Sequence, residues 1–334
     1  MKRFYKLILS TVFLLYLSNS NAQKTQATKM FRVYEENDFL NVSGNGTDRS
    51  YSNGTRFDFF YEKQTSRGLL HKLMPKAGDS SRNIYGWSLM QIMVTPKNIS
   101  ATGFSPNDYY YAGALFATHL LYSYNAKKKY SFQTELLAGI RGPGSLAEQT
   151  QKAFHKLIDY QEPMGWDNQL KTQPLINIRF CVEKNLFSIN DFIELNAGSQ
   201  LRVGSFMDMV SLYPMLRIGR MSPYFNGYLD QYGSYTKNGK QIKTQYYLVF
   251  KPSVSFVAYN AMLKGERQSK ENDAYEYKNN ETGPEISNHL MDLQFGAVLA
   301  HGNFAFSYMQ TTTTAYTEGL YKHSFGNFSL YFRW

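Results

Sequence analysis

His155 has a sequence setting that suits acid–base chemistry. Ser145 and Glu148 form an S-x-x-E capping box, which predicts a helix that runs to about Asp159 and ends before Pro163. At about 100° per residue, such a helix has one apolar and one polar face. The apolar face holds Leu146, Ala153 and Leu157, and the polar face holds Glu148, Gln151, His155 and Asp159.

This polar stripe predicts a general base. Glu148 and Asp159 lie about two turns before and one turn after His155, where either carboxylate could orient the imidazole. The alternative is an exposed histidine on the wet face of a surface helix, since most titratable side chains on helices are solvated. The sequence has no G-x-S-x-G, no Ser-His-Asp order, and neither H-E-x-x-H nor C-x-x-C. A familiar serine or zinc hydrolase is therefore not indicated.

A second cluster is rich in oxygen donors. Glu36, Asn37 and Asp38 are followed, across a glycine-rich stretch, by polar residues over 47–54. Such oxygens suit a hard cation such as calcium, although Asn, Asp and Gly also serve simple turn geometry. Neighbouring residues of a regular strand point to opposite faces, so Asn37 and Asp38 can share a site only where the strand bends or bulges.

A third cluster, residues 164–170, contains Trp166 and leads out of the loop that carries the predicted helix. Trp166 alone could be an interface aromatic.

The elements that must position these clusters are predicted from the ends of the chain. Residues 1–22 read as a secretory signal: basic residues precede an apolar stretch over 7–17, and small residues Ser20 and Ala22 match a cleavage site. The mature domain would span residues 23–334. The alternative, an N-terminal membrane helix, is disfavoured because the stretch is short.

The C-terminus predicts a membrane strand. Phe328, Leu330, Phe332 and Trp334 alternate with polar or amphipathic residues, as in the terminal strand of an outer-membrane barrel. Aromatic residues make up 16% of the chain although its mean hydropathy is −0.44, a combination that a barrel explains because only alternate residues face lipid. The alternative is a half-buried strand of a soluble sandwich.

We therefore predict an all-β fold, a twelve-stranded antiparallel transmembrane β-barrel with a short helix in an extracellular loop. Segment 222–242 has some strand character and could change the count. The predicted strands lie near 29–40, 51–63, 83–95, 109–125, 129–141, 173–185, 189–204, 208–220, 244–263, 286–301, 303–316 and 321–334. An even number places both termini on the periplasmic side. Connections 41–50, 96–108, 142–172, 205–207 and 264–285 then face the cell exterior, and all three clusters lie at that rim.

Charge and cysteine content add less. The single cysteine, Cys181, excludes an intramolecular disulfide. The net charge of +10 falls to +7 once Lys2, Arg3 and Lys6 leave with the signal. A basic exported protein suits an anionic partner such as phosphorylated lipid A, and nucleic acid would fit the same number.

Taken in order, the motifs resemble the outer-membrane lipid A 3'-O-deacylase family. The resemblance rests on the following segments: residues 36–38, 47–49, 51–54, 95–96, Asp108 with 111–113, 142–143, 154–158, 162–163 and 165–170. It covers about residues 30–175.

The resemblance implies an active site at the outer rim, between the barrel wall and the loop helix, and dependence on Ca²⁺. The family's histidine corresponds to His155, its Asn-Asp pair to Asn37 and Asp38, and its hydroxyl residue to Ser52. We expect His155, Ser52 and Asn37 to be catalytic, with Asp38 and Asn37 holding the metal. Expected substrate contacts are Gln151, Glu162, Trp166 and Lys97.

Two departures from the family pattern stand out. The family commonly has Thr where Ser52 stands, and Asp-Arg-Pro where Asp108 is followed by Tyr109 and Tyr110. The second departure removes an arginine, together with any phosphate or loop contact that it makes.

The prediction is therefore a monomeric outer-membrane hydrolase of lipid A or lipopolysaccharide, with no nucleic-acid partner. It would remove the 3'-linked acyl or acyloxyacyl chain by calcium-assisted attack of water. The alternatives are a non-catalytic barrel, either a pore or an adhesin, and an outer-membrane phospholipase.

Overall fold

A computed structural model describes residues 27–42, 50–63, 74–103, 108–190, 192–265 and 285–334. The predicted signal peptide and residues 47–49 of the oxygen-rich cluster lie outside these ranges. Among the described residues, no helix combines the length and the apolar character needed to cross a membrane.

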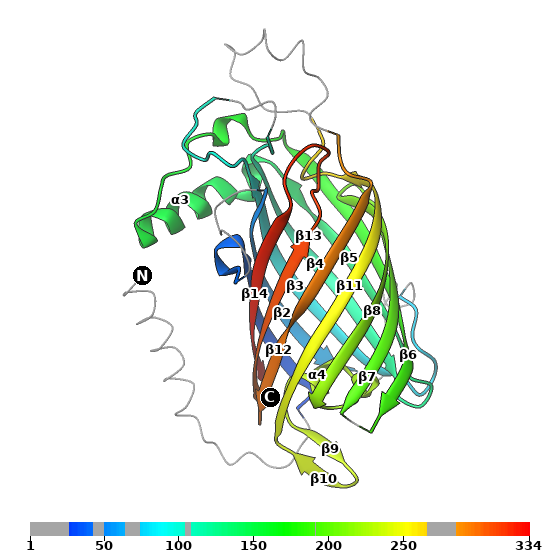
Figure 1. The fold of residues 1–334 in the computed structure, drawn as a ribbon. Coiled ribbons are helices and arrows are strands. Elements are labelled where there is room, and N and C mark those ends of the chain that lie inside the picture. Colours follow the sequence, from blue (N-terminus) through cyan, green and yellow to red (C-terminus); the bar gives the residue numbers. More distant parts are fainter. Residues whose placement is uncertain (1–26, 43–49, 64–73, 104–107, 191, 266–284) are drawn as a thin grey trace.

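Twelve antiparallel strands close into one barrel, as predicted (Figure 1). They are β1 (Lys29–Asn37), β2 (Ser50–Glu62), β3 (Arg82–Thr95), β4 (Ala112–Asn125), β5 (Tyr130–Arg141), β6 (Gln173–Ile189), β7 (Ile193–Gly204), β8 (Met207–Arg220), β11 (Thr244–Asn260), β12 (His289–His301), β13 (Phe304–Thr313) and β14 (His323–Arg333). Each strand pairs with its neighbours in the chain, and β1 closes the barrel against β14.

The closing seam shows how the alternation is used. Val33 pairs with Leu330, and the main-chain N–H of Thr28 donates to the carbonyl of Trp334 at 3.1 Å. Both ends of the wall therefore meet at one rim. Phe332 and Trp334 are exposed on the outer face, whereas Tyr331 and Arg333 are buried inside. This is the pattern of a wall with lipid outside and a polar interior.

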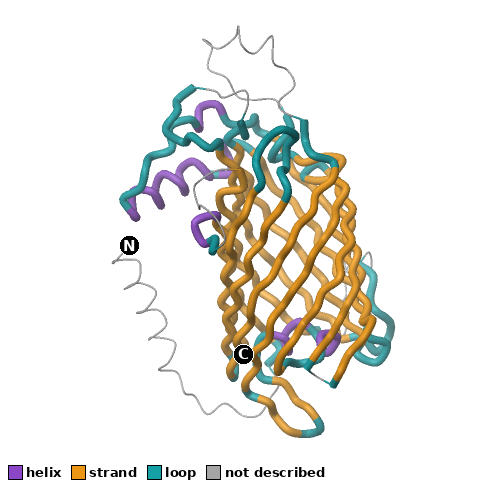
Figure 2. The backbone as a smooth tube through the Cα atoms, viewed as in Figure 1, coloured by secondary structure: helices purple, strands orange, loops and turns teal. Residues whose placement is uncertain are grey.

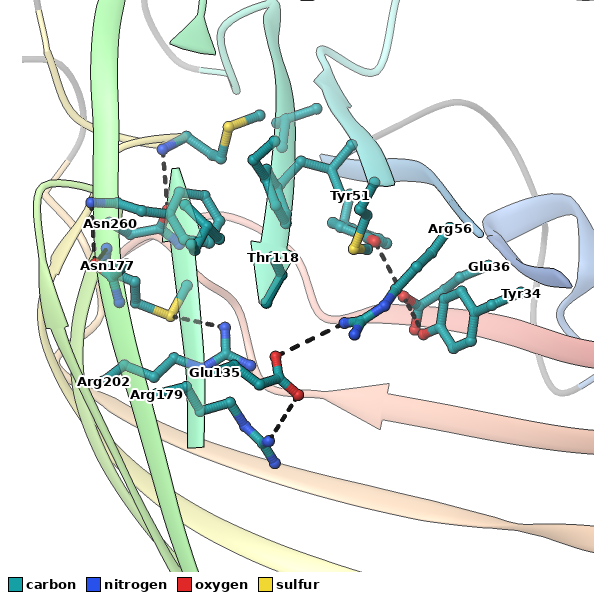
Figure 3. A pocket seen from close by; sticks show the side chains of 18 of the residues that line it. Tyr34, Glu36, Tyr51, Arg56, Thr118, Glu135, Asn177, Arg179, Arg202 and Asn260 are labelled. Atoms are coloured by element: carbon teal, nitrogen blue, oxygen red, sulfur yellow. Dashed lines mark hydrogen bonds and ion pairs between the residues drawn. The ribbon is translucent and has the colours of Figure 1, made fainter. Parts of the chain in front are cut away.

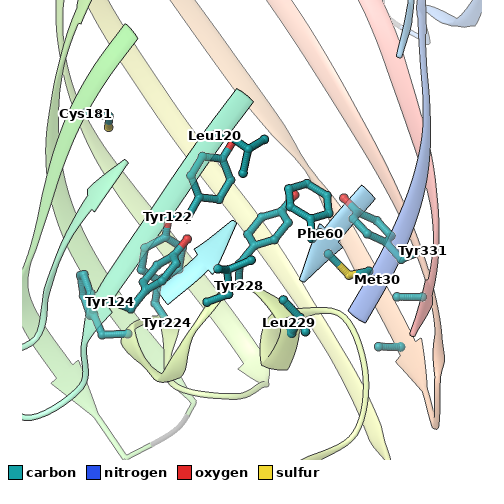
Figure 4. Close-up of a cluster of buried hydrophobic side chains, with 14 of the residues drawn as sticks. Met30, Phe60, Leu120, Tyr122, Tyr124, Cys181, Tyr224, Tyr228, Leu229 and Tyr331 are labelled. Carbon is teal, nitrogen blue, oxygen red and sulfur yellow. The ribbon is translucent and has the colours of Figure 1, made fainter. Parts of the chain in front are cut away.

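Segment 222–242 forms no part of the wall. It folds into η4 (Tyr224–Asn226), α4 (Tyr228–Gln231) and a small hairpin, β9 (Tyr235–Lys237) with β10 (Lys240–Ile242). The aromatic side chains of η4 and α4 point into the lumen and pack against Phe60 and Tyr122 of the wall (Figure 4). We call residues 221–233 the plug.

Buried ion pairs hold the plug at the rim that carries the chain ends. Arg217 contacts Glu194 at 2.6 Å, and Glu194 accepts the main-chain N–H of Tyr224 at 3.1 Å. Asp230 contacts Arg82 at 2.7 Å. An aromatic plug fixed by buried charges fills this end of the lumen, so the structure does not favour the pore alternative.

Candidate active site

Strand alternation decides which residues of the first motif face outward. Glu36 lines the lumen, so its neighbours Glu35 and Asn37 lie on the outer wall. The Glu35 carboxylate accepts hydrogen bonds from Thr55 Oγ1 at 2.7 Å and from Asn53 Nδ2. Glu35 was not among the predicted site residues, although its place two residues before Asn37 puts both on one face. A fixed carboxylate thus lies on the outer wall, directly below Asn37.

The first strand loses its regular geometry between the two predicted metal ligands, Asn37 and Asp38. β1 stops at Asn37, and Asp38–Leu40 form the 3-10 helix η1. The Asn37 Oδ1 accepts the main-chain N–H of Phe39 at 2.7 Å, which caps this turn, and Asp38 is only 2% exposed. The regular strand therefore ends between Asn37 and Asp38, which meets the condition for the two residues to share a site.

Ser52 lies at an irregularity in the neighbouring strand. Asn37 pairs with Asn53, and the register of β2 against β3 shifts between Tyr51 and Asn53. Ser52 is fully buried there, with its Oγ 2.5 Å from Thr95 Oγ1. The Asn37–Asn53 pair is the last of this ladder, so Asp38 and Ser52 are the residues that follow and precede it in the two strands' sequences.

A row of outward-facing polar residues leads from β1 to the loop helix. Glu35 pairs with Thr55, and Thr55 pairs with Gln91 on β3. The Gln91 Nε2 donates to the carbonyl oxygen of Ser145 at 2.7 Å. Ser145 ends η2 (Pro143–Ser145), which leads into α3 (Ala147–Ile158). Figures 1 and 2 show η1 and α3 outside the wall on the same side of the barrel.

Close packing fixes the start of α3 on the wall. A Cβ placed on Gly113 of β4 would lie 2.3 Å from the Cβ of Ala147, so only glycine allows this approach. Next to it, Met93, Ile99, Tyr111, Ala147 and Trp166 form a small buried cluster on the outer side of the wall.

The polar stripe of α3 faces the protein and its apolar face is exposed. His155 is 4% exposed and Gln151 is also buried, whereas Leu157 is 74% exposed. Phe154 and Leu146 are exposed as well. The alternative of a solvated histidine is therefore wrong. An apolar outer face suits a helix that lies beside a barrel within the lipid interface.

The capping box is not formed. The residue that caps α3 is Leu146, in the left-handed conformation with φ 59°. Glu148 instead contacts Lys152 at 2.8 Å, and this hydrogen bond raises the pKa of the Lys152 amine. The 3-10 helix η2 leads directly into α3, so the helix begins without the reciprocal side-chain hydrogen bonds between Ser145 and Glu148 that a capping box contains.

A main-chain carbonyl contacts the imidazole of His155. Its Nδ1 lies 2.5 Å from the carbonyl oxygen of Gln161, and the Tyr160 ring packs edge-on at 5.1 Å. Asp159 ends the helix in a left-handed conformation and is exposed. The contact at Nδ1 is thus neither of the two carboxylates that the sequence suggested. An Nδ1–H donated to a carbonyl leaves Nε2 as the basic nitrogen.

Trp166 and Gln151 hold α3 in place. Trp166 begins η3 (Trp166–Asn168), is 1% exposed and donates from Nε1 to Gln151 Oε1 at 2.8 Å. Its ring lies 4.9 Å from that of Tyr111. Trp166 is therefore not an exposed interface aromatic. The side-chain oxygen of Gln151, a residue expected to contact substrate, accepts this hydrogen bond from the indole.

Glu162 and Lys97 are exposed residues of the loops around this site. The Lys97 main-chain N–H donates to Asp108 Oδ2 at 2.8 Å, and Tyr321 donates to Asp108 Oδ1 at 3.2 Å. Asp108, which begins the stretch that departs from the family pattern, therefore ties three segments together at the rim.

The rim ends of β1, β2 and β3 carry side chains with oxygen donors. Asp38 supplies a carboxylate, while Asn37, Ser52 and Thr95 supply neutral oxygens. Over the described ranges, no three His, Cys, Asp or Glu side chains gather in the way a metal site built from those residues requires. One carboxylate with neutral oxygens fits calcium better than zinc.

The model of the family described as outer membrane protein LpxR matches residues 7–334. The chain belongs to this family. The recognition made from its motifs, that of the outer-membrane lipid A deacylases, is therefore confirmed. Membership of the LpxR family also agrees with an outer-membrane location for the barrel.

The fold is also that of a solved structure, LpxR from Salmonella typhimurium. LpxR from Salmonella typhimurium has a TM-score of 0.71 at 13% identity, covering 91% of this chain and all of that one. The translocator domain of the autotransporter NalP from Neisseria meningitidis has a TM-score of 0.42 at 9% identity, covering 100% and 97%. The β domain of the Bordetella autotransporter BrkA has a TM-score of 0.41 at 10% identity, covering 93% and 99%. A comparison with curated protein sequences finds no significant match.

Proposed function

We propose that the protein hydrolyses an ester of lipid A at its outer rim, removing the 3'-linked acyl or acyloxyacyl chain. The observation that carries this proposal is the setting of His155. It is a buried residue of α3, which lies outside the wall, and its Nδ1 contacts a main-chain carbonyl. A histidine so placed meets a lipid that approaches from the leaflet rather than a solute in the lumen.

The lipid chains have an apolar surface to follow. Leu157 and Phe154 of α3 and Phe39 of η1 are exposed on the same side of the barrel. Polar groups lie beside them on the wall, namely Glu35, Asn37 and Asn53. An amphiphile with a polar sugar and long acyl chains could place its chains on the apolar residues and its sugar on the polar residues of the wall.

In the proposed reaction, His155 Nε2 accepts a proton from water, and the resulting hydroxide attacks the ester carbonyl carbon. The carbonyl of Gln161 holds the ring through Nδ1 and stabilises the imidazolium that forms. The imidazolium then returns its proton to the leaving alkoxide of the sugar. A general base of this kind contributes about 10²- to 10⁴-fold in rate.

Calcium is part of the proposal. Asp38 and Asn37 would hold the ion, with Ser52 beside them. When bound, calcium polarises the ester carbonyl and stabilises the oxyanion, an effect often worth several kcal/mol. The buried Asp38 carboxylate supplies the negative charge that such a site needs.

Mass spectrometry of lipid A tests the function directly. Lipid A from cells that express the protein should lack the mass of one acyl or acyloxyacyl group, compared with cells that carry an empty vector. His155→Ala should leave lipid A intact at an equal amount of folded barrel, whereas Lys156→Ala, on the exposed side of the same helix, should act like wild type. Unchanged lipid A with phospholipid cleavage would show a phospholipase instead.

A further inference from the structure

A cavity of about 420 Å³ lies inside the barrel (Figure 3). The helix that carries His155, α3, lies outside the wall (Figure 1). The cavity floor touches the plug, since Arg32 lines the cavity and donates to Tyr228 Oη of α4 at 3.0 Å. Its volume falls within the range of about 300–1,000 Å³ that is usual for small-molecule sites. The proposed reaction uses none of its residues.

Arginines dominate the lower half of this cavity. Arg32 and Arg56 share Asp58, at 2.8 and 2.7 Å. Arg179 contacts Glu135 at 3.0 Å. The remaining acidic residue of the lining is Glu36, whose carboxylate accepts hydrogen bonds from Tyr34 at 2.7 Å and from Tyr51 at 3.0 Å.

Among the described residues, Arg202 forms no salt bridge within 4 Å, although the Glu135 carboxylate lies near enough to interact with it electrostatically. It pairs directly across the ladder with Arg179, so two guanidinium groups lie on the same face of adjacent strands. Its Nη1 contacts only the Met207 sulfur at 3.8 Å, and its Nε is buried without a hydrogen-bond partner, as is Arg56 Nη2. Like charges placed opposite each other are destabilising, and an unpaired buried charge costs free energy. An anion bound between these groups would relieve both costs.

The upper half of the cavity is apolar. The residues there come from the last turns of the wall and from the segments at the outer rim: Ile92, Val94, Phe116, Phe206, Met262 and Leu263. Asn177 and Asn260 add neutral polar groups to the lining, as do Thr118 and Tyr316. The cavity therefore presents cationic groups at its base and an apolar wall toward the rim.

We propose that the lumen binds one single-chain carboxylic acid, with its carboxylate at Arg202 and Arg56 and its alkyl chain along the apolar upper wall. The base favours an anion, and the wall favours an alkyl chain over a fully hydrated anion such as phosphate. The site is separate from the outer surface that carries His155, and the proposal does not depend on the deacylase assignment.

Carbon-13 NMR tests this with [1-¹³C]laurate added to the folded full-length barrel in a non-ionic detergent. His155→Ala serves as the parent so that no hydrolysis interferes. We expect a bound carboxylate resonance that saturates at about one laurate per barrel. Arg202→Gln in that parent should weaken binding about tenfold or more, because a charge-assisted hydrogen bond is lost. Arg220→Gln, an exposed arginine at the opposite rim, is the matched control and should bind like the parent.

Competition experiments with unlabelled compounds test which part of the ligand, the carboxylate or the alkyl chain, the site recognises. Unlabelled laurate should displace the signal, whereas inorganic phosphate and 1-dodecanol at the same concentration should not. Displacement by phosphate alone would make this a simple anion site and overturn the proposal, and so would equal displacement by dodecanol. Unchanged laurate binding in Arg202→Gln, at equal folded fraction by gel mobility, would also overturn it.

Discussion

The indole Nε1 of Trp166 donates a hydrogen bond to Gln151 Oε1 at 2.8 Å, and both side chains are buried against the outer wall. Gln151 lies one turn before His155 on α3, and Trp166 lies in the loop that leads back to β6. One hydrogen bond thus joins the helix that carries the proposed base to the segment that closes its loop. We expect the position of His155 to depend on this contact.

Trp166→Phe should therefore lower deacylation without unfolding the barrel. The change removes the indole donor of the buried Gln151 oxygen, and the loss of a buried hydrogen bond costs about 1–3 kcal/mol. A shift of His155 by about 1 Å can cost about 10²-fold in rate. Released fatty acid should be measured at matched amounts of folded protein, together with trypsin cleavage at Lys152 and Lys156, which should accelerate. Trp87→Phe, at an exposed position on β3, is the control, and equal activity of the two variants would contradict this role.

Gly113→Ala should displace α3 from the wall. The added Cβ would lie 2.3 Å from Ala147 Cβ and 2.4 Å from Ser145 Oγ, so the start of the helix must move. We expect activity to fall at least tenfold through misplacement of His155, with unchanged heat-modifiable gel mobility. Gly103→Ala is the matched control because nothing lies within 4 Å of its added Cβ. Wild-type activity in Gly113→Ala would show that α3 need not contact β4.

Glu194→Ala should destabilise the plug. Glu194 pairs with buried Arg217 at 2.6 Å and accepts the main-chain N–H of Tyr224. Removal of one partner of a buried pair costs about 3–5 kcal/mol because the other charge is left uncompensated. In lipid vesicles, Glu194→Ala should unfold at a lower urea concentration than the wild type. The control Glu318→Ala, at an exposed position, should unfold at the wild-type midpoint. Ion conduction in planar bilayers should rise in the variant if the plug closes the lumen.

The barrel could be predicted because the alternation of inward- and outward-facing side chains can be read within each strand's own sequence. Strand alternation places Arg333 inside and Trp334 outside, and each strand repeats the same period of two. The plug was not predictable in this way, because Tyr224, Phe225 and Tyr228 carry no clear period and could equally have formed a wall strand. Only their packing in the lumen separates the two outcomes.

The helix of the site was predicted with its position correct and its environment wrong. Residues 147–158 are helical, but the outward face is Leu157 and Phe154 rather than the polar stripe. A polar face normally meets water, and here it meets the polar outer wall of a barrel that stands in lipid. The partner of His155 was missed for a related reason: Gln161 contributes a carbonyl, which every residue has.

Calcium removal should abolish deacylation, because the donors at the rim are oxygens and the proposed ester polarisation depends on the ion. Released fatty acid should fall to background in excess EGTA and return when calcium is added. Asp38→Ala should also be inactive, since it removes the buried carboxylate of the donor set. Glu285→Ala, at an exposed position in another connection, should keep wild-type activity and calcium response.

The Asp38 and His155 variants should differ in how they respond to the ion. High calcium should restore part of the activity of Asp38→Ala, because a weakened site can still fill by mass action. It should restore none in His155→Ala, which lacks the base but keeps every proposed ligand. Equilibrium binding of radioactive calcium to the folded barrels should show weaker binding in Asp38→Ala and normal binding in His155→Ala. Full activity of the wild type in excess chelator would remove calcium from the mechanism, while normal calcium binding by Asp38→Ala would remove Asp38 from the site.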